Sequence, residues 1–167
     1  AAIGLLRDRP GVTALVMGRA TEGHETFLAG LRARASAAGL AGRILFLPEV
    51  PVHDVADWYR ALDLYVAPQR WEGFGLTPLE AMACGVPVVA TRVGAFEEIV
   101  TVETGCHVPP GDIAALAAAV APFLDDAGLR QRAGLAALER VRSRFRIEDE
   151  AAALVAVYRR LLGGERW

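Results

Sequence analysis

The stretch Glu72-Gly-Phe-Gly-Leu-Thr-Pro-Leu-Glu80 decides the interpretation of this chain, because two acids flank a glycine turn and the start of a helix. Thr77 is a favourable N-cap residue, Pro78 suits the first helical position, and Glu80 follows where a capping box would place an acid. A helix that begins here points its free N–H groups at the glycine turn, which makes an anion site. The segment therefore combines a phosphate cradle with two hydroxyl-binding acids, and a nucleotide-sugar presents matching groups.

The two glutamates each have a functional and a purely structural interpretation. Glu72 lies beside Gly73-Phe74-Gly75, so we favour it as an acceptor of hydrogen bonds from sugar hydroxyls over an exposed loop acid without a role. Glu80 either binds the ribose hydroxyls of a nucleotide, which we favour, or returns to the N–H of Thr77 in a capping box. The glycines either let the backbone approach a ligand or form an ordinary tight turn. In the functional interpretation, both glutamate side chains converge around one bound saccharide.

Composition narrows the possible classes of protein. The chain has 167 residues and a formal net charge of -2, which fits one domain without bulk attraction for nucleic acid or acidic lipid. Cys84 and Cys106 make no disulfide framework, so free thiols in a reducing compartment are expected. The histidines share no spacing with these cysteines, and we expect no metal site.

Targeting signals are not visible in the sequence, which contains neither a signal peptide nor a bilayer-spanning stretch. We therefore expect a cytoplasmic protein, peripheral at the inner face of the membrane in its full-length form. Ala1–Leu6 resembles the tail of a helix already under way, so we expect the chain to be part of a longer protein.

Apolar runs alternate with helical stretches along the chain. The predicted strands are Thr13–Gly18, Arg43–Leu47, Leu64–Ala67, Pro87–Ala90 and Cys106–Val108. The predicted helices are His24–Ala38, Asp54–Leu62, Thr77–Cys84, Ala95–Val100, and most of the chain from Ile113, with breaks near Asp125–Gly128 and Arg146. Strands that are apolar throughout are typical of a parallel sheet covered on both faces. The pattern predicts an α/β fold, a Rossmann-like doubly wound parallel sheet with helices on both faces.

Ligands of such sheets bind beyond the carboxyl ends of the strands. The segments that follow predicted strands are Gly18, Pro48–Val50, Gln69–Gly75 and Thr91–Gly94. Arg19 and Arg70 lie at this edge, where each is either a partner for phosphate or a solvated surface arginine. Trp58 and Tyr59 lie within a predicted helix, and we interpret them as packing residues rather than as a stacking platform.

The segment Glu72–Glu80 resembles the two-glutamate signature of the retaining GT-B glycosyltransferases of the glycosyltransferase-4 type. The flanking stretches Trp58–Pro68, Glu80–Thr91, Gly94–Val100 and Thr104–Asp112 are also similar to that family, so the resemblance covers nearly the whole chain. It implies two Rossmann-like domains that face a cleft. Residues 1–167 are similar to the second of these, a single nucleotide-sugar-binding domain truncated at its N-terminus and separated from the acceptor domain.

The resemblance also implies roles for individual residues. Glu72 corresponds to the catalytic acid that contacts the donor sugar, and Glu80 to the acid that binds the ribose. The resemblance adds Glu49, Val50, Phe74, Gly75 and Leu76 to the donor-binding set. Gly18, Arg19, Arg70 and Gly73 complete the set because they follow strands at the predicted binding edge. Within this set, Phe74–Leu76 meets the sugar and pyrophosphate through its backbone, and Pro48–Val50 holds the base by main-chain contacts.

The family's chemistry implies that a phosphate oxygen of the donor deprotonates the acceptor and that neither a metal nor another cofactor is required. The amino-acid sequence of Ala67–Glu80 most resembles that of lipopolysaccharide-core mannosyltransferases, and this resemblance implies GDP-mannose as the donor. The reaction expected of the parent protein is transfer of a hexose to a glycan or lipopolysaccharide-core acceptor.

This chain departs from the family pattern in three places. The family's phosphate-binding arginine and lysine lie before Ala1, the acceptor domain is missing, and Gly18-Arg19-Ala20 stands where many relatives have a second glycine. We therefore expect the isolated domain to bind donor weakly and to transfer nothing. Two other functions stay open, namely a non-catalytic nucleotide-sugar-binding module and another GT-B enzyme such as an epimerase.

The expected partners are a nucleotide-sugar and the missing acceptor domain. An apolar stripe in the last predicted helix would contact that domain, and its members are Leu154, Val157, Tyr158 and Leu161. We expect no nucleic-acid partner and no strong membrane contact.

Overall fold

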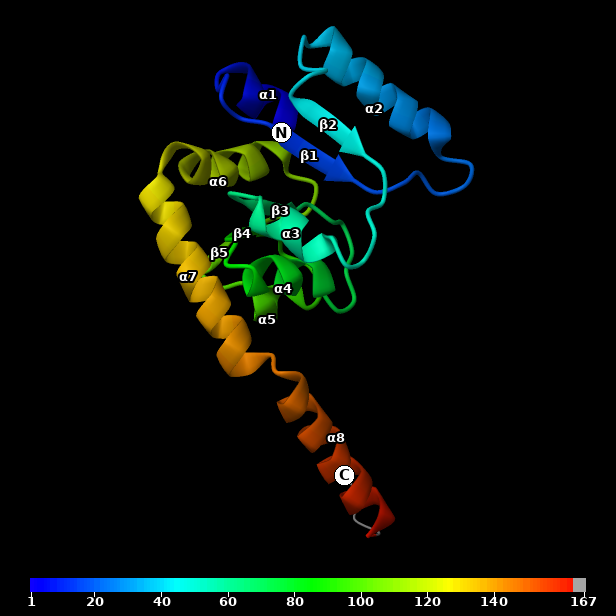
Figure 1. Ribbon diagram of the computed structural model, residues 1–167, viewed down its shortest axis with the longest axis vertical. Helices are drawn as coiled ribbons and strands as arrows, with labels where there is room; N and C mark the ends of the chain where they lie inside the picture. The colour runs from blue at the N-terminus through cyan, green and yellow to red at the C-terminus, as the bar shows by residue number, and fades with distance from the viewer. Residues whose placement is uncertain (164–167) are drawn as a thin grey trace.

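The computed structural model describes residues 1–163 and alternates short strands with helices, as the sequence predicts (Figure 1). The strands are β1 (Ala14–Met17), β2 (Ile44–Leu47), β3 (Tyr65–Ala67), β4 (Val88–Thr91) and β5 (Gly105–Val108). The helices are α1 (Ala2–Arg7), α2 (Glu25–Ala37), α3 (Val55–Arg60), α4 (Leu76–Ala83), α5 (Phe96–Ile99), α6 (Ile113–Asp125), α7 (Ala127–Arg144) and α8 (Ile147–Leu162).

All strand pairs are parallel, which confirms the predicted fold class. Hydrogen bonds join the strands in the orders β1-β2 and β3-β4-β5, and no ladder links β1 to β3 within residues 1–163. The two groups of strands are instead held by shared side-chain packing, since Ile44 of β2, Val66 of β3 and Val89 of β4 belong to one apolar cluster.

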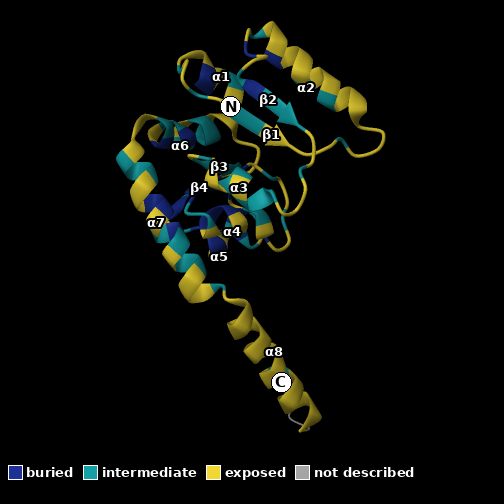
Figure 2. Ribbon diagram, in the orientation of Figure 1, coloured by how far each residue is buried: buried dark blue, intermediate teal, exposed yellow. Residues whose placement is uncertain are grey.

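The central strand β4 explains why helices cover both faces. Val88, Val89 and Ala90 are all fully buried, and successive side chains of a strand point to opposite faces. Val88 and Ala90 therefore pack in the cluster that contains Met82 of α4, whereas Val89 packs in the cluster on the other face. Figure 2 shows the buried residues gathered around β4, α4 and α5.

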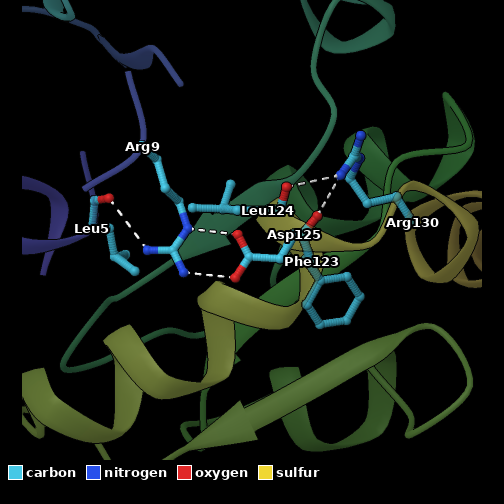
Figure 3. A network of polar contacts seen from close by, with 6 residues as sticks. All are labelled: Leu5, Arg9, Phe123, Leu124, Asp125 and Arg130. Carbon is cyan, nitrogen blue, oxygen red and sulfur yellow. Dashed lines mark hydrogen bonds and ion pairs between the residues drawn. The ribbon is translucent and has the colours of Figure 1, made fainter. Parts of the chain in front are cut away.

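Two arginine side chains contact the C-terminal end of α6 (Figure 3). Arg9 forms a bidentate ion pair with Asp125 at the end of α6, with both N–O distances at 2.7 Å. Arg130 donates to the carbonyl oxygens of Phe123 (2.7 Å) and Leu124 (3.3 Å). These carbonyls lie in the last turn of α6, where the helix itself supplies no partner, so the arginines fasten α6 to its neighbours.

The last helix, α8, extends away from the rest of the molecule (Figures 1 and 2). None of its residues is buried, and the side chains of Leu154, Tyr158 and Leu161 are 48–60% exposed. The apolar stripe predicted from the sequence is therefore uncovered. No helix within residues 1–163 is both long and apolar enough to cross a membrane.

Candidate functional site

The carboxyl ends of β3 and β4 bring two loops of the predicted binding edge together. The hydroxyl of Thr91, the last residue of β4, donates to the carbonyls of Ala67 (3.3 Å) and Gln69 (2.5 Å), so the loop after β3 is tied to β4. Further along both loops, Gly94 approaches the backbone of Glu72 closely. The segments Gln69–Gly75 and Thr91–Gly94 thus form one surface.

Glu72 lies in the glycine turn with its carboxylate folded back onto that turn. Its Oε1 accepts hydrogen bonds from the backbone N–H groups of Gly73 (2.9 Å), Phe74 (3.3 Å) and Gly75 (3.3 Å). Successive N–H groups that converge in this way form an anion-binding concavity. The turn can therefore accept an anionic oxygen, and in this structure the oxygen belongs to Glu72.

Gly75 is the N-cap of α4, and it has a left-handed conformation with φ +87°. A Cβ atom at this position would lie 2.6 Å from Ile99 and 3.2 Å from the ring of Phe96, so only glycine fits without displacing the core. The prediction of Thr77 as N-cap is wrong, because Thr77 and Pro78 already lie inside α4 and the helix has no side-chain cap. The left-handed glycine lets the chain enter the helix earlier than the sequence pattern suggests.

Glu80 also differs from its capping-box interpretation. With Gly75 as the cap, Glu80 is no longer spaced to return to it, and its Oε2 accepts a hydrogen bond from the hydroxyl of Tyr59 at 2.9 Å. Tyr59 comes from α3, and its ring packs edge-on against Tyr65 with the centroids 5.7 Å apart. The prediction that Tyr59 packs is correct for the ring but misses the hydroxyl, which holds an acid of the candidate site.

The hydroxyl of Tyr65 experiences the charges of both Glu72 and Glu80. Burial is the main cause that raises its pKa, a hydrogen bond with Thr77 lowers it, and the charges of Glu80 and Glu72 both raise it. Both carboxylates therefore act on one phenol. The pKa of Tyr59 is raised by burial and by its hydrogen bond to Glu80, so this hydroxyl stays protonated and remains a donor.

Gly94 is a member of the site that residue-by-residue reasoning from the sequence missed. Its φ is +48°, and a Cβ atom there would lie 2.0 Å from the carbonyl oxygen of Glu72. Such contact is far inside van der Waals distance, so the loop after β4 fits against Glu72 only with glycine. The sequence placed Gly94 at the binding edge but gave no sign of this approach.

The remaining predicted residues lie along the same edge of the strands. Arg19, after β1, forms an ion pair with Glu49, after β2, at 3.3 Å, and both side chains are largely exposed. Gly18 has φ +135° with open space around it, and Val50 is half-buried. No hydrogen bond or ion pair joins this pair to Glu72 or Glu80 within residues 1–163.

The surface around the glycine turn is apolar and uncovered. Trp71, Phe74 and Leu76 are 82%, 61% and 59% exposed, and Arg70 beside them is also exposed. Two hollows lie away from this turn, one between α2 and β2 and the other between α7 and the segment Thr101–Thr104. Across residues 1–163, no three His, Cys, Asp or Glu side chains are grouped to hold a metal ion.

Comparison with known proteins gives a consistent set of similarities. The family model described as "Glycosyl transferases group 1" matches residues 1–126. The lipopolysaccharide core biosynthesis mannosyltransferase LpsB of Rhizobium meliloti is 53% identical over 163 residues, which is 96% of this chain and 46% of that protein. LpcC of Rhizobium leguminosarum bv. viciae, with the same description, is 52% identical over 99% of this chain and 47% of its own length. The chain thus spans about half the length of these relatives.

Solved structures resemble the chain over most of its length. The sucrose-phosphate synthase of Thermosynechococcus elongatus covers 98% of this chain and 42% of its own chain, with a TM-score of 0.86 and 30% identity. The C-terminal domain of a group 1 glycosyl transferase (LpcC) from Francisella tularensis covers 87% and 76%, with a TM-score of 0.80 and 33% identity. Anabaena Alr3699/HepE in complex with UDP covers 92% and 44%, with a TM-score of 0.82 and 28% identity.

Proposed function

Because this chain belongs to the group 1 glycosyl transferase family, we propose that residues 1–167 form the nucleotide-sugar-binding half of a retaining glycosyltransferase. The observation that carries the proposal is the convergence of three backbone N–H groups, from Gly73 to Gly75, on one carboxylate oxygen beyond the end of β3. A donor's phosphate or sugar oxygen is a suitable occupant for the same donors. The UDP complex of a structural neighbour supports this class of ligand.

Donor binding involves an exchange at the glycine turn. The oxygen of the donor takes over the N–H groups of Gly73, Phe74 and Gly75, and the released carboxylate of Glu72 turns to accept hydrogen bonds from sugar hydroxyls. The N-terminal end of α4 carries a partial positive charge of roughly half an elementary charge. It faces the diphosphate and stabilises the negative charge that develops there when the sugar leaves.

The reaction needs no metal or other cofactor in this proposal. The bond between the anomeric carbon and the diphosphate oxygen breaks, and the acceptor oxygen bonds to that carbon on the same face. The acceptor proton passes to an oxygen of the departing diphosphate. The part that this domain contributes is to hold the diphosphate and to orient the sugar through Glu72.

The nucleoside end of the donor lies toward the carboxyl ends of β1 and β2. Glu80 accepts hydrogen bonds from the ribose hydroxyls, and the main chain at Glu49 and Val50 holds the base. Arg19 and Arg70 are placed to pair with phosphate, and Gly18 leaves room for the donor. The ion pair between Arg19 and Glu49 is exposed at both partners, so a phosphate can compete for Arg19 at small cost.

The donor and acceptor are proposed from the relatives. Two relatives are described as lipopolysaccharide core mannosyltransferases, which supports mannose from GDP-mannose and a lipopolysaccharide-core acceptor. The exposed turn at Trp71, Phe74 and Leu76 and the uncovered stripe of α8 are surfaces that a facing acceptor domain would cover. The whole protein then works in the cytoplasm, at the inner face of the membrane where its acceptor is built.

The test is ligand-observed NMR of the 167-residue chain against GDP-mannose, GDP-glucose, UDP-glucose and ADP-glucose at equal concentrations. Saturation transfer to GDP-mannose that excess GDP displaces supports the proposal, and preference for another base corrects the donor. Signals from none of the four would overturn it. A transfer assay on the full-length protein then separates an enzyme from a binding module.

A further inference from the structure

We infer that Tyr59 is a positioning residue for the donor, because its hydroxyl holds the carboxylate of Glu80 in the orientation that meets the ribose. The inference rests on the proposed function of this edge and adds a residue from α3 to it. Tyr59 does not touch the donor itself in this account. It acts through Glu80.

The geometry of the pair separates a fixed partner from a mobile one. The ring of Tyr59 is half-buried, lies edge-on to Tyr65 at 5.7 Å, and packs against the apolar cluster beneath α4. Glu80 is exposed on α4, so its side chain is not held in one rotamer by packing. The hydrogen bond of 2.9 Å between them therefore transfers the rigidity of the packed ring to the exposed acid.

The carboxylate has capacity for both partners. Its Oε2 accepts from Tyr59, while no hydrogen bond to Oε1 is recorded within the part of the chain that the structure describes. An ionised carboxylate offers about four lone-pair sites, so Oε1 and the second lone pair of Oε2 can receive the two ribose hydroxyls. A tyrosine hydroxyl suits this role because it donates a hydrogen bond to the carboxylate and, being neutral, leaves the negative charge of Glu80 in place.

A positioning role makes a different prediction from a purely packing role. If Tyr59 orients Glu80 for ribose, removal of the hydroxyl weakens only ligands that carry ribose hydroxyls. If Tyr59 only packs in the apolar core, removal of its hydroxyl changes the affinity for all ligands equally or for none of them. Tyr59→Phe is the suitable change, since it keeps the ring and its contact with Tyr65.

The experiment measures dissociation constants by NMR titration of the 167-residue chain with GDP and UDP, each beside its 2′,3′-dideoxy counterpart. We expect Tyr59→Phe to weaken the better-bound ribonucleotide about threefold to tenfold, the range for the net contribution of one ordinary hydrogen bond, because Tyr59 acts on the ligand only through Glu80. The dideoxy compound should be unaffected. Glu80→Gln should lose the same ribose preference, and the double variant should lose no more than Glu80→Gln alone.

The matched control is Tyr158→Phe, which removes the same hydroxyl from an exposed residue of α8 and leaves the bond from Tyr59 to Glu80 in place. It should keep the ribose preference of the unaltered chain, with folding of each variant checked by thermal melting. Equal losses for both members of a nucleotide pair, or no loss in Tyr59→Phe, would overturn the inference while leaving nucleotide binding intact. Failure of the unaltered chain to bind either ribonucleotide would overturn the proposed function and the inference together.

Discussion

At the scale of single residues, Glu72 is the side chain whose placement says most about the site. Its carboxylate accepts hydrogen bonds from the amide groups of its own turn, so in the proposed function a donor has to displace it. That Glu72 and the two glycines share one turn was predictable from sequence, because they are neighbours along the chain, but the folding of the carboxylate back onto the turn was not. Tyr59 and Gly94 were not, because their contacts with Glu80 and Glu72 span 21 residues or more and follow no spacing rule.

If the full-length protein is the proposed glycosyltransferase, Glu72→Gln should lower its kcat about a hundredfold, a loss typical of one interaction that strengthens in the transition state. The amide cannot offer the charge that a carboxylate brings to the sugar. Thermal unfolding should change little, since Glu72 is not fully buried. Glu97→Gln, which alters an exposed acid paired with Arg92, is the matched control and should keep full turnover. Full activity of Glu72→Gln would refute the role of Glu72.

Gly94→Ala should displace the backbone of Glu72, because the new Cβ would lie 2.0 Å from its carbonyl oxygen. Gly39→Ala is the control, as Gly39 also has positive φ (+70°) but has no atom within 4 Å of the added Cβ. We expect the close contact to cost about 1–3 kcal/mol more than the control in urea unfolding. Nucleotide binding should be lost only in Gly94→Ala. Equal behaviour of the two variants would contradict this account of the loop.

At the scale of elements, the local sequence predicts the end of α4 correctly but not its start. The end of this helix was predicted at Gly85, which has φ +78° and follows the C-cap. Its start was predicted two residues late, because both Thr77 and Gly75 are plausible caps. The packed fold favours glycine at position 75, because a Cβ atom there would lie too close to Ile99 and Phe96, and the local sequence does not show this.

The ion pair that fastens α6 to the loop after α1 should make stability depend on pH. The hydrogen bond from Arg9 lowers the pKa of Asp125 below its ordinary value of about 4. A lowered pKa in the folded state gives stability that is present above the ordinary value and is lost as pH falls through the folded value. The free-energy difference of unfolding between the unaltered chain and Arg9→Gln should therefore be constant near neutrality and shrink below pH 4.

Urea titrations at several pH values measure this difference. In the background of Asp125→Asn, Arg9→Gln should produce no pH-dependent change, since the titrating partner is gone. A difference between the unaltered chain and Arg9→Gln that grows toward low pH would show that another acid is responsible.

At the scale of the whole molecule, apolar runs alternating with helices were enough to predict a parallel α/β fold, because strands buried on both faces have a distinct composition. Composition does not reveal which strands form ladders. The absence of a ladder between β1 and β3 in residues 1–163 was therefore not predictable, and shared side-chain packing holds the two groups of strands instead.

Deletion of residues 147–167 should leave the stability of the rest nearly unchanged. No described residue of α8 is buried, and surface changes away from special contacts usually alter stability by less than about 0.5 kcal/mol. Thermal melting of the shortened and complete chains, at matched low concentration, checks this. A large fall in melting temperature would mean that α8 packs on the domain in solution.

The central claim is that the turn from Glu72 to Gly75 binds the donor, and amide chemical shifts report on it directly. In ¹⁵N-labelled chain titrated with GDP-mannose, and with UDP-glucose as the second donor, we predict saturable shifts of the Gly73, Phe74 and Gly75 N–H signals with one of the two. Glu72→Gln should already change these signals before ligand is added. Saturable shifts elsewhere in the molecule, with the three turn amides unmoved, would contradict the account.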